Sequence, residues 1–321
     1  MRAAYVEVAN PADPLAALVV GERPDPEVRQ GWVRVRVRAA SLNHHDVWSL
    51  RGVGLPPERM PMILGTDAAG TTDEGREVVV HPVISSDGWA GDETLDPKRS
   101  LLSEVHQGTL AEWVVVPERN VVDKPAALTF EEAACVPTAY LTAFRMLTRD
   151  AGLWKPGTVL VQGASGGVAS AAIQLAKALG HRVWATARTE AKRDFARSLG
   201  ADEAFEPGAR LPERVDLVVE TVGEATWSHS LKSLRPGGTV VVCGATSGAN
   251  PPADLNRVFF LQLRVIGSTM GNKEELAGVM ALMERAGVRP RIDRMVGFDA
   301  LPDAVAALAA GDVLGKVVLQ P

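Results

Sequence analysis

Hydrophobic and polar positions alternate along the first third of the chain as they do in a β-sheet with one buried face. Trp32–Val37 alternates with a period of two, which predicts a half-buried strand. Arg76–His81 and Leu110–Val116 are further predicted strands, each bordered by Gly or Pro. The polar stretch Pro82–Gly108 between them is too long for an ordinary connection, which indicates a lobe or a functional loop.

The pattern changes near Pro125. Thr129–Leu147 has helical spacing and opens with Thr129 and Glu132 in the arrangement of a capping box. Short apolar strands then alternate with helices, and these strands are predicted at Thr158–Gln162, Arg182–Thr186, Val215–Glu220, Thr239–Cys243 and Arg264–Gly267. Strands that are apolar on both faces and separated by helices predict a parallel sheet covered on two sides.

The last predicted strand, Gly315–Leu319, comes too late in the chain for that sheet to need it, so we assign it to the first domain. We therefore expect an α/β protein of two domains. Residues 1–124 and 290–321 form the β-rich domain, and residues 125–289 form a Rossmann domain with a doubly wound parallel sheet.

A glycine loop lies between a buried strand and a helix in Val159–Gly180. Gly163 permits a tight turn, Gly166 lets the backbone approach a pyrophosphate, and Ala169 lets the helix pack closely on the sheet. The first turn of the helix offers free N–H groups to the phosphates. This context predicts a dinucleotide site, and the alternative is a turn with only a structural role.

The choice of cofactor is usually made about 20 residues further on, at the end of the second strand. Neither Thr186 nor Ala187 is acidic there, so a 2′-phosphate would meet no repulsion. Arg188 and Lys192 supply cations that bind phosphate, which favours NADPH over NADH. The alternative is a solvated helix start with ordinary surface charges.

Composition and charge narrow the class of protein further. The chain has 321 residues, of which 46% are hydrophobic and 23% charged, with a formal net charge of −5. Because the basic residues form no cluster, we expect no nucleic-acid partner. No apolar stretch approaches the roughly 20 residues of a membrane span, and no secretory signal is evident, so we expect a cytoplasmic protein. Cys135 and Cys243 have no metal-ligand spacing and are interpreted as small buried hydrophobes.

Several motifs in order resemble the medium-chain dehydrogenase/reductases, and specifically their quinone-oxidoreductase-like branch. They are Ser41–Asp46, Leu64–Gly70, the glycine loop, Gly267–Gly271 and Gly315–Val318, so the resemblance covers nearly the whole chain. The resemblance implies that the β-rich domain is GroES-like and catalytic, and that the Rossmann domain is inserted into it.

The resemblance also implies where a catalytic zinc would be held. Zinc-dependent members have a Cys, a His and a further Cys or Asp at positions that here are Asn43, Thr66 and a residue near Thr138. Amide and hydroxyl oxygens are poor ligands for Zn²⁺ beside thiolate and imidazole. The loop Pro82–Gly108, whose counterpart holds a structural zinc in such relatives, contains no cysteine. We therefore expect no metal.

The nicotinamide performs hydride transfer, so the protein supplies placement, electrostatics and a proton. Without zinc there is no Lewis acid to polarise a simple carbonyl, which favours quinones and α,β-unsaturated ketones or aldehydes as substrates. Asn43 is expected to donate an amide N–H to the acceptor oxygen, and His45 is the candidate proton donor. Asp46 completes the candidate catalytic group, although we expect Asp46 and Asp67 to hold neighbouring loops. For each His the alternative is a structural histidine.

The resemblance places the cofactor contacts along both domains. The residues are His44, Thr138, Thr142, Gly163, Ala164, Ser165, Gly166, Gly167, Val168, Thr186, Arg188, Lys192, Val222, Cys243, Gly244, Ala245, Thr269, Met270, Gly315 and Lys316.

Two other functions stay open. One is a catalytically idle NADPH-binding regulatory protein, and the other is an alcohol dehydrogenase of the same superfamily that uses water and His45 in place of zinc. The apolar segment Val258–Val265, expected as strand at a sheet edge, predicts a homodimer.

Overall fold

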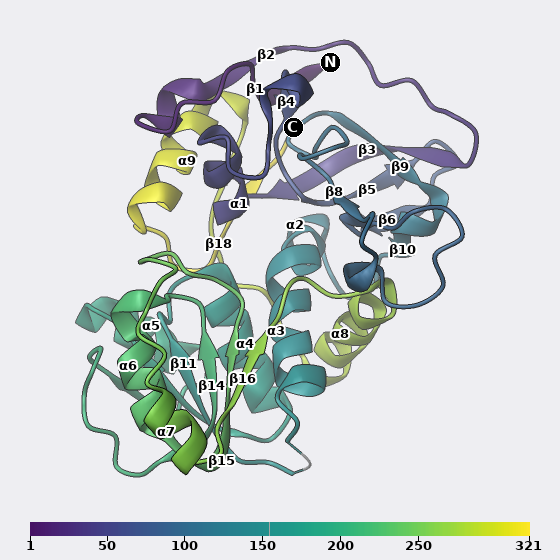
Figure 1. Ribbon diagram of the computed structural model, residues 1–321. Helices are drawn as coiled ribbons and strands as arrows, with labels where there is room; N and C mark the ends of the chain where they lie inside the picture. The colour runs from purple at the N-terminus through teal and green to yellow at the C-terminus, as the bar shows by residue number, and fades with distance from the viewer. Residues whose placement is uncertain (154) are drawn as a thin grey trace. The chain divides into compact units, whose positions relative to one another are not determined.

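The computed structural model describes residues 1–153 and 155–321 of the chain (Figure 1). The chain divides into two units. Unit 1 consists of Met1–Leu141, Met270–Glu284 and Arg289–Pro321, and unit 2 consists of Thr142–Thr269 and Arg285–Val288. Residues 125–141 therefore pack with unit 1, whereas the sequence assigned them to the Rossmann domain. The predicted limits of the two domains stay a prediction.

The main sheet of unit 1 is built around the long strand β3 (Trp32–Ser41). It pairs antiparallel with β5 (Asp67–Thr72), β9 (Trp113–Pro117) and β18 (Lys316–Leu319). The sheet continues through β6 (Glu77–Val80), β10 (Val121–Asp123) and β17 (Ile292–Val296). The three strands expected in the first third are thus present, and the C-terminal strand joins them as predicted.

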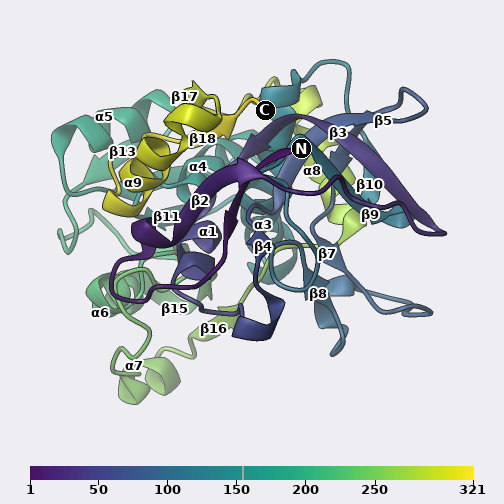
Figure 2. The same ribbon diagram turned by 90° about the horizontal axis from the view of Figure 1, so that it is seen from above.

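Two smaller sheets complete the strands of unit 1. One has the order β2-β1-β4, from β1 (Arg2–Val6), β2 (Leu18–Glu22) and β4 (Met62–Ile63), and the first two run side by side in Figure 2. The other pairs β7 (Val83–Ile84) with β8 (Ser100–Leu101) inside the long polar stretch.

The polar stretch Pro82–Gly108, which contains no cysteine, is held by hydrogen bonds. The carboxylate of Asp96 accepts from the backbone N of Ser86 at 2.6 Å and from that of Lys98 at 2.8 Å. Trp89 and Leu95 are 39% and 64% exposed, and the indole N–H of Trp89 donates to the backbone O of Asp92 at 3.0 Å. The polar turns of the loop satisfy their own backbone.

The helices of unit 1 are α1 (His44–Leu50), α2 (Phe130–Ala134), α9 (Leu301–Ala310) and most of α8 (Lys273–Ala286). The capping box at Thr129 and Glu132 is confirmed, with the two hydrogen bonds at 3.0 and 3.2 Å. The single helix predicted over Thr129–Leu147 is wrong in detail, because a π-helical turn at Val136–Tyr140 separates α2 from α3 (Leu141–Arg145). Pro137 lacks the N–H that a regular α-helix needs there.

Unit 2 is a six-stranded parallel sheet with the order β13-β12-β11-β14-β15-β16 (Figure 1). The strands are β11 (Thr158–Gln162), β12 (Arg182–Thr186), β13 (Glu203–Phe205), β14 (Val215–Glu220), β15 (Leu234–Val242) and β16 (Arg264–Gly267). Counted from β11, this is the strand order 3-2-1-4-5-6 of dinucleotide-binding folds, so the predicted doubly wound sheet is confirmed. Ligands of such sheets bind beyond the carboxyl ends of the strands, where the order reverses between β11 and β14.

The helices of unit 2 include α4 (Gly167–Ala178), α5 (Glu190–Ser198), α6 (Glu224–Ser233) and α7 (Leu255–Phe260). The segment expected as edge strand, Val258–Val265, instead begins as the last turn of α7 and becomes strand only at Arg264. Among the helices that the structure describes, none is long and apolar enough to cross a membrane.

Candidate active site

The start of α1 is fixed by the carboxylate of Asp46. It accepts a hydrogen bond from the backbone N of Asn43 at 2.8 Å and one from the backbone N of Gly65 at 3.0 Å. Asp46 is fully buried, and burial raises its pKa from 3.8 to about 6. Asp46 therefore joins the first turn of α1 to the turn before β5, and its oxygens face backbone groups.

Several side chains donate hydrogen bonds to Asp67, the first residue of β5. Its carboxylate accepts from Ser41 Oγ at 2.9 Å, Asn43 Nδ2 at 2.9 Å and Thr138 Oγ1 at 2.5 Å. Thr66 Oγ1 lies 3.0 Å from Thr138 Oγ1 and 3.2 Å from Asn43 Nδ2. The three positions that resemblance assigned to zinc ligands thus meet in one cluster, and the π-helical turn brings Thr138 to it.

Lys316, the first residue of β18, points its ammonium into the same cluster. Nζ donates to the backbone O of Leu42 at 2.8 Å and to Oδ1 of Asn43 at 2.6 Å. It forms an ion pair with Asp67 Oδ2 at 3.5 Å, and the two side chains are 2% and 0% exposed. Lys316 was expected to bind the cofactor, but its ammonium is directed into unit 1, so such a contact would have to come from its backbone.

These residues do not fit a zinc ion. The three ligand positions offer the amide of Asn43 and the hydroxyls of Thr66 and Thr138, and the neighbouring Asp67 offers a carboxylate. The ammonium of Lys316 already contacts the oxygens of Asn43 and Asp67. Catalytic zinc in proteins is held by three ligands drawn from imidazole, thiolate and carboxylate. Within the described residues, no three His, Cys, Asp or Glu side chains are grouped so that they could hold a metal.

The amide of Asn43 is engaged at both ends. Its two N–H hydrogens face Asp67 and Thr66, and its oxygen accepts from Lys316. Donation from Asn43 to a substrate oxygen therefore stays a prediction, and it would require one of these bonds to break.

His45 is held by two residues of the long polar loop. Its Nε2 lies 2.9 Å from Glu104 Oε1, and its Nδ1 lies 3.3 Å from Ser103 Oγ. Burial lowers the His45 pKa, but the hydrogen bond with Glu104 and the charges of Asp46, Glu104 and Asp67 outweigh burial, so the pKa is raised overall. The sequence did not indicate Glu104, because it lies 59 residues away in a loop without a motif. His44 is exposed, and its pKa is lowered by desolvation and then by Lys316 and Arg51.

The glycine loop of unit 2 has the geometry that a pyrophosphate needs. Gly163 has φ +75°, and a Cβ there would lie 2.8 Å from Val222 Cγ2, so only glycine fits. A Cβ at Gly166 would meet nothing within 4 Å, so the space beside it is open to a ligand. Gly166 is also the N-cap of α4, and the first N–H groups of a helix have no partner within the helix and can bind an anion.

The ends of β15 and β16 line a pocket in unit 2. An open pocket of about 430 Å³ is lined by Val242–Ala245 after β15 and by Gly267–Thr269 after β16. It contains four of the predicted cofactor residues, Cys243, Gly244, Ala245 and Thr269. Cys135 is buried as expected, whereas Cys243 is only half-buried; desolvation still raises the pKa of the Cys243 thiol to about 12.

The end of β12 carries the charges predicted to select the cofactor. Thr186 is buried and donates its hydroxyl to Gln162 Oε1 at 2.5 Å, so a cofactor contact would have to come from its backbone. Arg188 is exposed, and in the described part of the chain it has no hydrogen-bond or ion-pair partner. Glu190, two residues further along the chain, is paired with Arg197 at 2.8 Å and Arg193 at 2.7 Å, and these hydrogen bonds lower its pKa.

The other predicted contacts are distributed between the units. Thr142 is buried in unit 2, and Ala164 donates its backbone N–H to Thr186 O at 3.0 Å. Ser165 and Val168 flank the glycines at the start of α4. Met270 and Gly315 belong to unit 1 and have φ of 54° and 107°.

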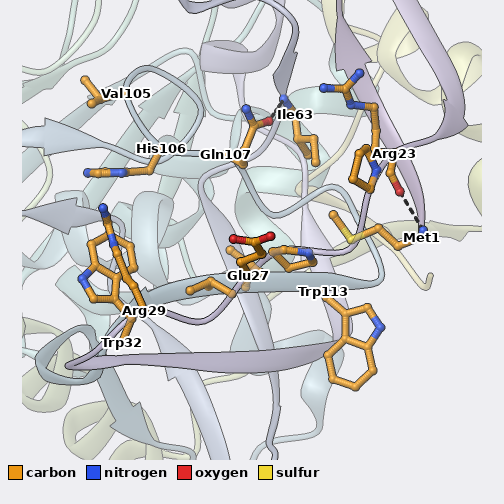
Figure 3. Close-up of a pocket in the computed structure, with 14 residues that line it drawn as sticks. Met1, Arg23, Glu27, Arg29, Trp32, Ile63, Val105, His106, Gln107 and Trp113 are labelled. Carbon is orange, nitrogen blue, oxygen red and sulfur yellow. Dashed lines mark hydrogen bonds between the residues drawn. The ribbon is translucent and has the colours of Figure 1, made fainter.

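A separate hollow on unit 1 is lined by residues outside the predicted set (Figure 3). It measures about 420 Å³, and the Arg29 guanidinium lies 3.5 Å from the ring centre of Trp32 at its edge. His106 packs edge-on against the same Trp32 with ring centres 5.1 Å apart. The Arg29 guanidinium and the His106 ring therefore both have Trp32 as a contact partner within the protein.

Two family models match parts of the chain. Residues 29–126 match the family model of an alcohol dehydrogenase GroES-like domain, and residues 167–285 match that of a zinc-binding dehydrogenase. The expected GroES-like fold is thereby confirmed.

Two curated relatives cover most of the chain. An acryloyl-coenzyme A reductase of Sulfurisphaera tokodaii is 30% identical over 94% of this chain and 95% of its own. A 2-methylene-furan-3-one reductase of Solanum lycopersicum is 33% identical over 92% of this chain and 73% of its own.

Two solved structures are closely similar in fold. An NAD-dependent alcohol dehydrogenase is 36% identical with a TM-score of 0.93 and covers 100% of both chains. The 2-octenoyl-CoA carboxylase reductase CinF, in complex with NADP and 2-octenoyl-CoA, is 28% identical with a TM-score of 0.90, over 99% of this chain and 87% of its own.

Proposed function

The chain belongs to the medium-chain dehydrogenase/reductase superfamily, in its quinone-oxidoreductase-like branch, and from this membership we propose that it reduces an α,β-unsaturated carbonyl compound or a quinone with NADPH and without zinc. Membership itself makes the chain an oxidoreductase with a nicotinamide dinucleotide cofactor. The electron acceptor, the preference for NADPH and the absence of zinc are the proposed parts.

One observation carries the proposal: amide and hydroxyl groups around a buried lysine stand at the zinc-ligand positions. A centre of this kind offers no Lewis acid to polarise a simple carbonyl. A conjugated acceptor needs less polarisation, because its negative charge spreads over an enolate or a quinol ring. The acryloyl-coenzyme A reductase and furanone reductase relatives are named for conjugated acceptors, which supports the same substrate class.

When bound, NADPH supplies the hydride, and the chain supplies its placement. The backbone at Gly163–Gly167 is shaped to bind the pyrophosphate, and Arg188 is available to a 2′-phosphate. His45 Nε2 faces Glu104, whose hydrogen bond raises the His45 pKa and favours the protonated ring, so His45 is the proposed proton donor.

The test measures NADPH oxidation with an enone, an enoyl thioester, a quinone and a simple aldehyde, at protein concentrations far below the substrate. We expect turnover with the conjugated acceptors, little with the aldehyde, and no effect of a chelator. With deuteride on NADPH, the label is expected on the β-carbon of the enone product. Loss of turnover on chelation, or faster reduction of the aldehyde, would contradict the proposal.

An alcohol dehydrogenase is the second candidate, favoured by the solved NAD-dependent alcohol dehydrogenase at 36% identity. It predicts about one zinc per chain retained through dialysis, and oxidation of simple alcohols with NAD⁺. Cofactor binding without turnover of any acceptor would favour an idle regulatory protein instead.

A further inference from the structure

Three neighbouring strands of unit 2 each end in a buried polar residue. They are Gln162 of β11, Thr186 of β12 and Glu220 of β14, which are 0%, 1% and 0% exposed. We propose that hydrogen bonds among these side chains hold the glycine loop in the shape that binds the dinucleotide. This role rests on the glycine loop as the pyrophosphate site of the proposed function. It does not depend on the electron acceptor or on the preference for NADPH.

The hydrogen bonds form a chain that runs in one direction. Thr186 Oγ1 donates to Gln162 Oε1 at 2.5 Å. Gln162 Nε2 donates to Ser230 Oγ at 3.0 Å, and it also lies 3.0 Å from His229 Nδ1. Ser230 Oγ then donates to Glu220 Oε2 at 2.5 Å. Each hydroxyl thus gives its hydrogen to the next member, and hydrogen bonds in such a chain strengthen one another.

The chain ends at Glu220, a buried carboxylate that no cation pairs with in the part of the molecule that the structure describes. Its oxygens accept from the backbone N of Val222 at 2.8 Å and from that of Gly223 at 3.0 Å. Thr226 Oγ1 donates to it as well, at 2.9 Å. Gly223 is the N-cap of α6, so the positive end of that helix faces the carboxylate. A buried polar group is tolerated when hydrogen bonds replace its water in this way.

Two members of the chain also fix the backbone of the glycine loop. Gly163 follows Gln162 directly, and the backbone O of Gln162 accepts from Thr221 Oγ1 at 3.2 Å. The backbone N of Ala164 donates to the backbone O of Thr186 at 3.0 Å. A change in the side-chain bond between Gln162 and Thr186 is therefore transmitted to the first two residues of the loop.

Val222 limits the loop from the direction of β14. Its backbone N is held by Glu220, and a Cβ at Gly163 would lie only 2.8 Å from Val222 Cγ2. The turn at Gly163 and the side chain of Val222 therefore fit closely, and Glu220 keeps them together. A site that is formed before its ligand arrives loses less free energy to ordering when the ligand binds.

The experiment removes one buried hydroxyl and keeps the shape of the side chain. Thr186→Val deletes the first donor of the chain, and Thr186→Ser restores it. The apparent affinity of a ligand falls with the fraction of protein that is ready to bind it. We therefore expect Thr186→Val to raise the dissociation constants for NADPH and NADH by the same factor, about fivefold or more, and Thr186→Ser to regain most of the loss. Unequal losses for the two cofactors, or no recovery with Thr186→Ser, would overturn the proposed role.

Thr158→Val is the matched control. Thr158 is 7% exposed and is the first residue of β11, and its hydroxyl accepts from Nε of Arg182 at 3.1 Å. The control makes the same substitution in the same two strands, at the ends away from the loop. It should lower the urea midpoint and leave both dissociation constants unchanged. A loss of affinity equal to that of Thr186→Val would show that any lost bond in the sheet weakens binding, which would count against the chain.

Ser230→Ala breaks the same chain from α6. Because Thr186 and Ser230 act through one chain, the double variant should lose less affinity than the sum of the two single losses. In the protein without cofactor, the amide hydrogens of Ala164 and Val222 should exchange faster in each single variant. Strictly additive losses, or unchanged exchange at both amides, would refute the coupling between the chain and the loop.

Gly166→Val separates this role from the proposed function. A Cβ at Gly166 would meet nothing within 4 Å, so a side chain there fits the fold and fills the space assigned to the pyrophosphate. We expect it to abolish binding of both cofactors. Unchanged binding would mean that the loop is not the site, and the role of the chain would fall with it. Lost binding in Gly166→Val together with full affinity in Thr186→Val would refute the role of the chain alone.

Discussion

Arg188→Ala tests the cofactor preference directly. Arg188 follows β12, is exposed, and has no partner among the residues that the structure describes, so its guanidinium is available to a ligand. Glu190, two residues further along the chain, is paired with Arg193 and Arg197 and not with Arg188. We predict that the substitution weakens NADPH binding and leaves NADH binding nearly unchanged, because NADH lacks the 2′-phosphate.

The size of the effect follows from the interaction that the substitution removes. A hydrogen bond to a charged group contributes about 1.5–3 kcal/mol, and every 1.4 kcal/mol is about tenfold in affinity. The dissociation constant for NADPH should therefore rise by about tenfold to a hundredfold. Because Arg188 is exposed, added salt should screen its interaction with the phosphate and bring the affinities of the two proteins closer together.

The assay is a fluorescence titration of both proteins with NADPH and with NADH at low and high salt. Lys232→Ala is the matched control, since Lys232 is an exposed cation in the last turn of α6, and that turn leads into the amino end of β15. It should change neither affinity. Equal losses for NADPH and NADH in Arg188→Ala, or no loss at all, would refute the assignment of Arg188 to the 2′-phosphate.

Four further predictions concern single groups. Glu104→Gln should lower the His45 pKa, because the hydrogen bond with Glu104 raises it; an NMR titration of the imidazole that shows no change would contradict this. Asp46 has a folded pKa of about 6, raised from 3.8, so its contribution to stability is present below about pH 4 and is lost as the pH rises through about 6. Urea unfolding should show that this pH dependence disappears in Asp46→Asn. The thiol of Cys135, which is buried and has its pKa raised to about 12 by desolvation, should react slowly with a thiol reagent near neutral pH until urea is added, and fast labelling of the native protein would count against burial. We predict a homodimer in which Phe260, 75% exposed at the end of α7, is covered; Phe260→Asp should then sediment as a monomer, and a monomeric natural chain would refute the dimer.

Much of the parallel sheet could be predicted. β11, β12 and β14 have the predicted bounds, because a strand buried on both faces is a continuous apolar run that neighbouring turns delimit sharply. β16 also has its predicted bounds although it is largely exposed, whereas β15 begins at Leu234 and ends at Val242 instead of spanning Thr239–Cys243, and β13 was not predicted. The strand predicted at Val258–Val265 was wrong, since a short apolar run by itself does not distinguish a helix end from a strand. The interruption of the predicted helix at Pro137 could have been predicted, because a proline inside a helical pattern indicates that the regular α-helix is broken there.

The polar contacts of the site could be predicted only in part. Asn43, Thr66 and Thr138 were found through resemblance to a motif, and the structure brings them together. Glu104 and Lys316 lie 59 and 273 residues from their partners, and nothing in their local sequence identifies those partners. Such contacts follow from how β18 and the loop of residues 82–108 fold onto α1, which a local pattern does not encode.

Asp67 explains why these distant residues form one unit. A buried carboxylate accepts hydrogen bonds but cannot donate them, so every group that faces it must be a donor or a cation. Ser41, Asn43 and Thr138 meet that condition with hydroxyl or amide hydrogens, and Lys316 meets it with charge. The polar residues that face Asp67 therefore depend on one another. Replacing any one of them by an apolar residue would leave a buried acceptor with one partner fewer, at a cost to the stability of the fold.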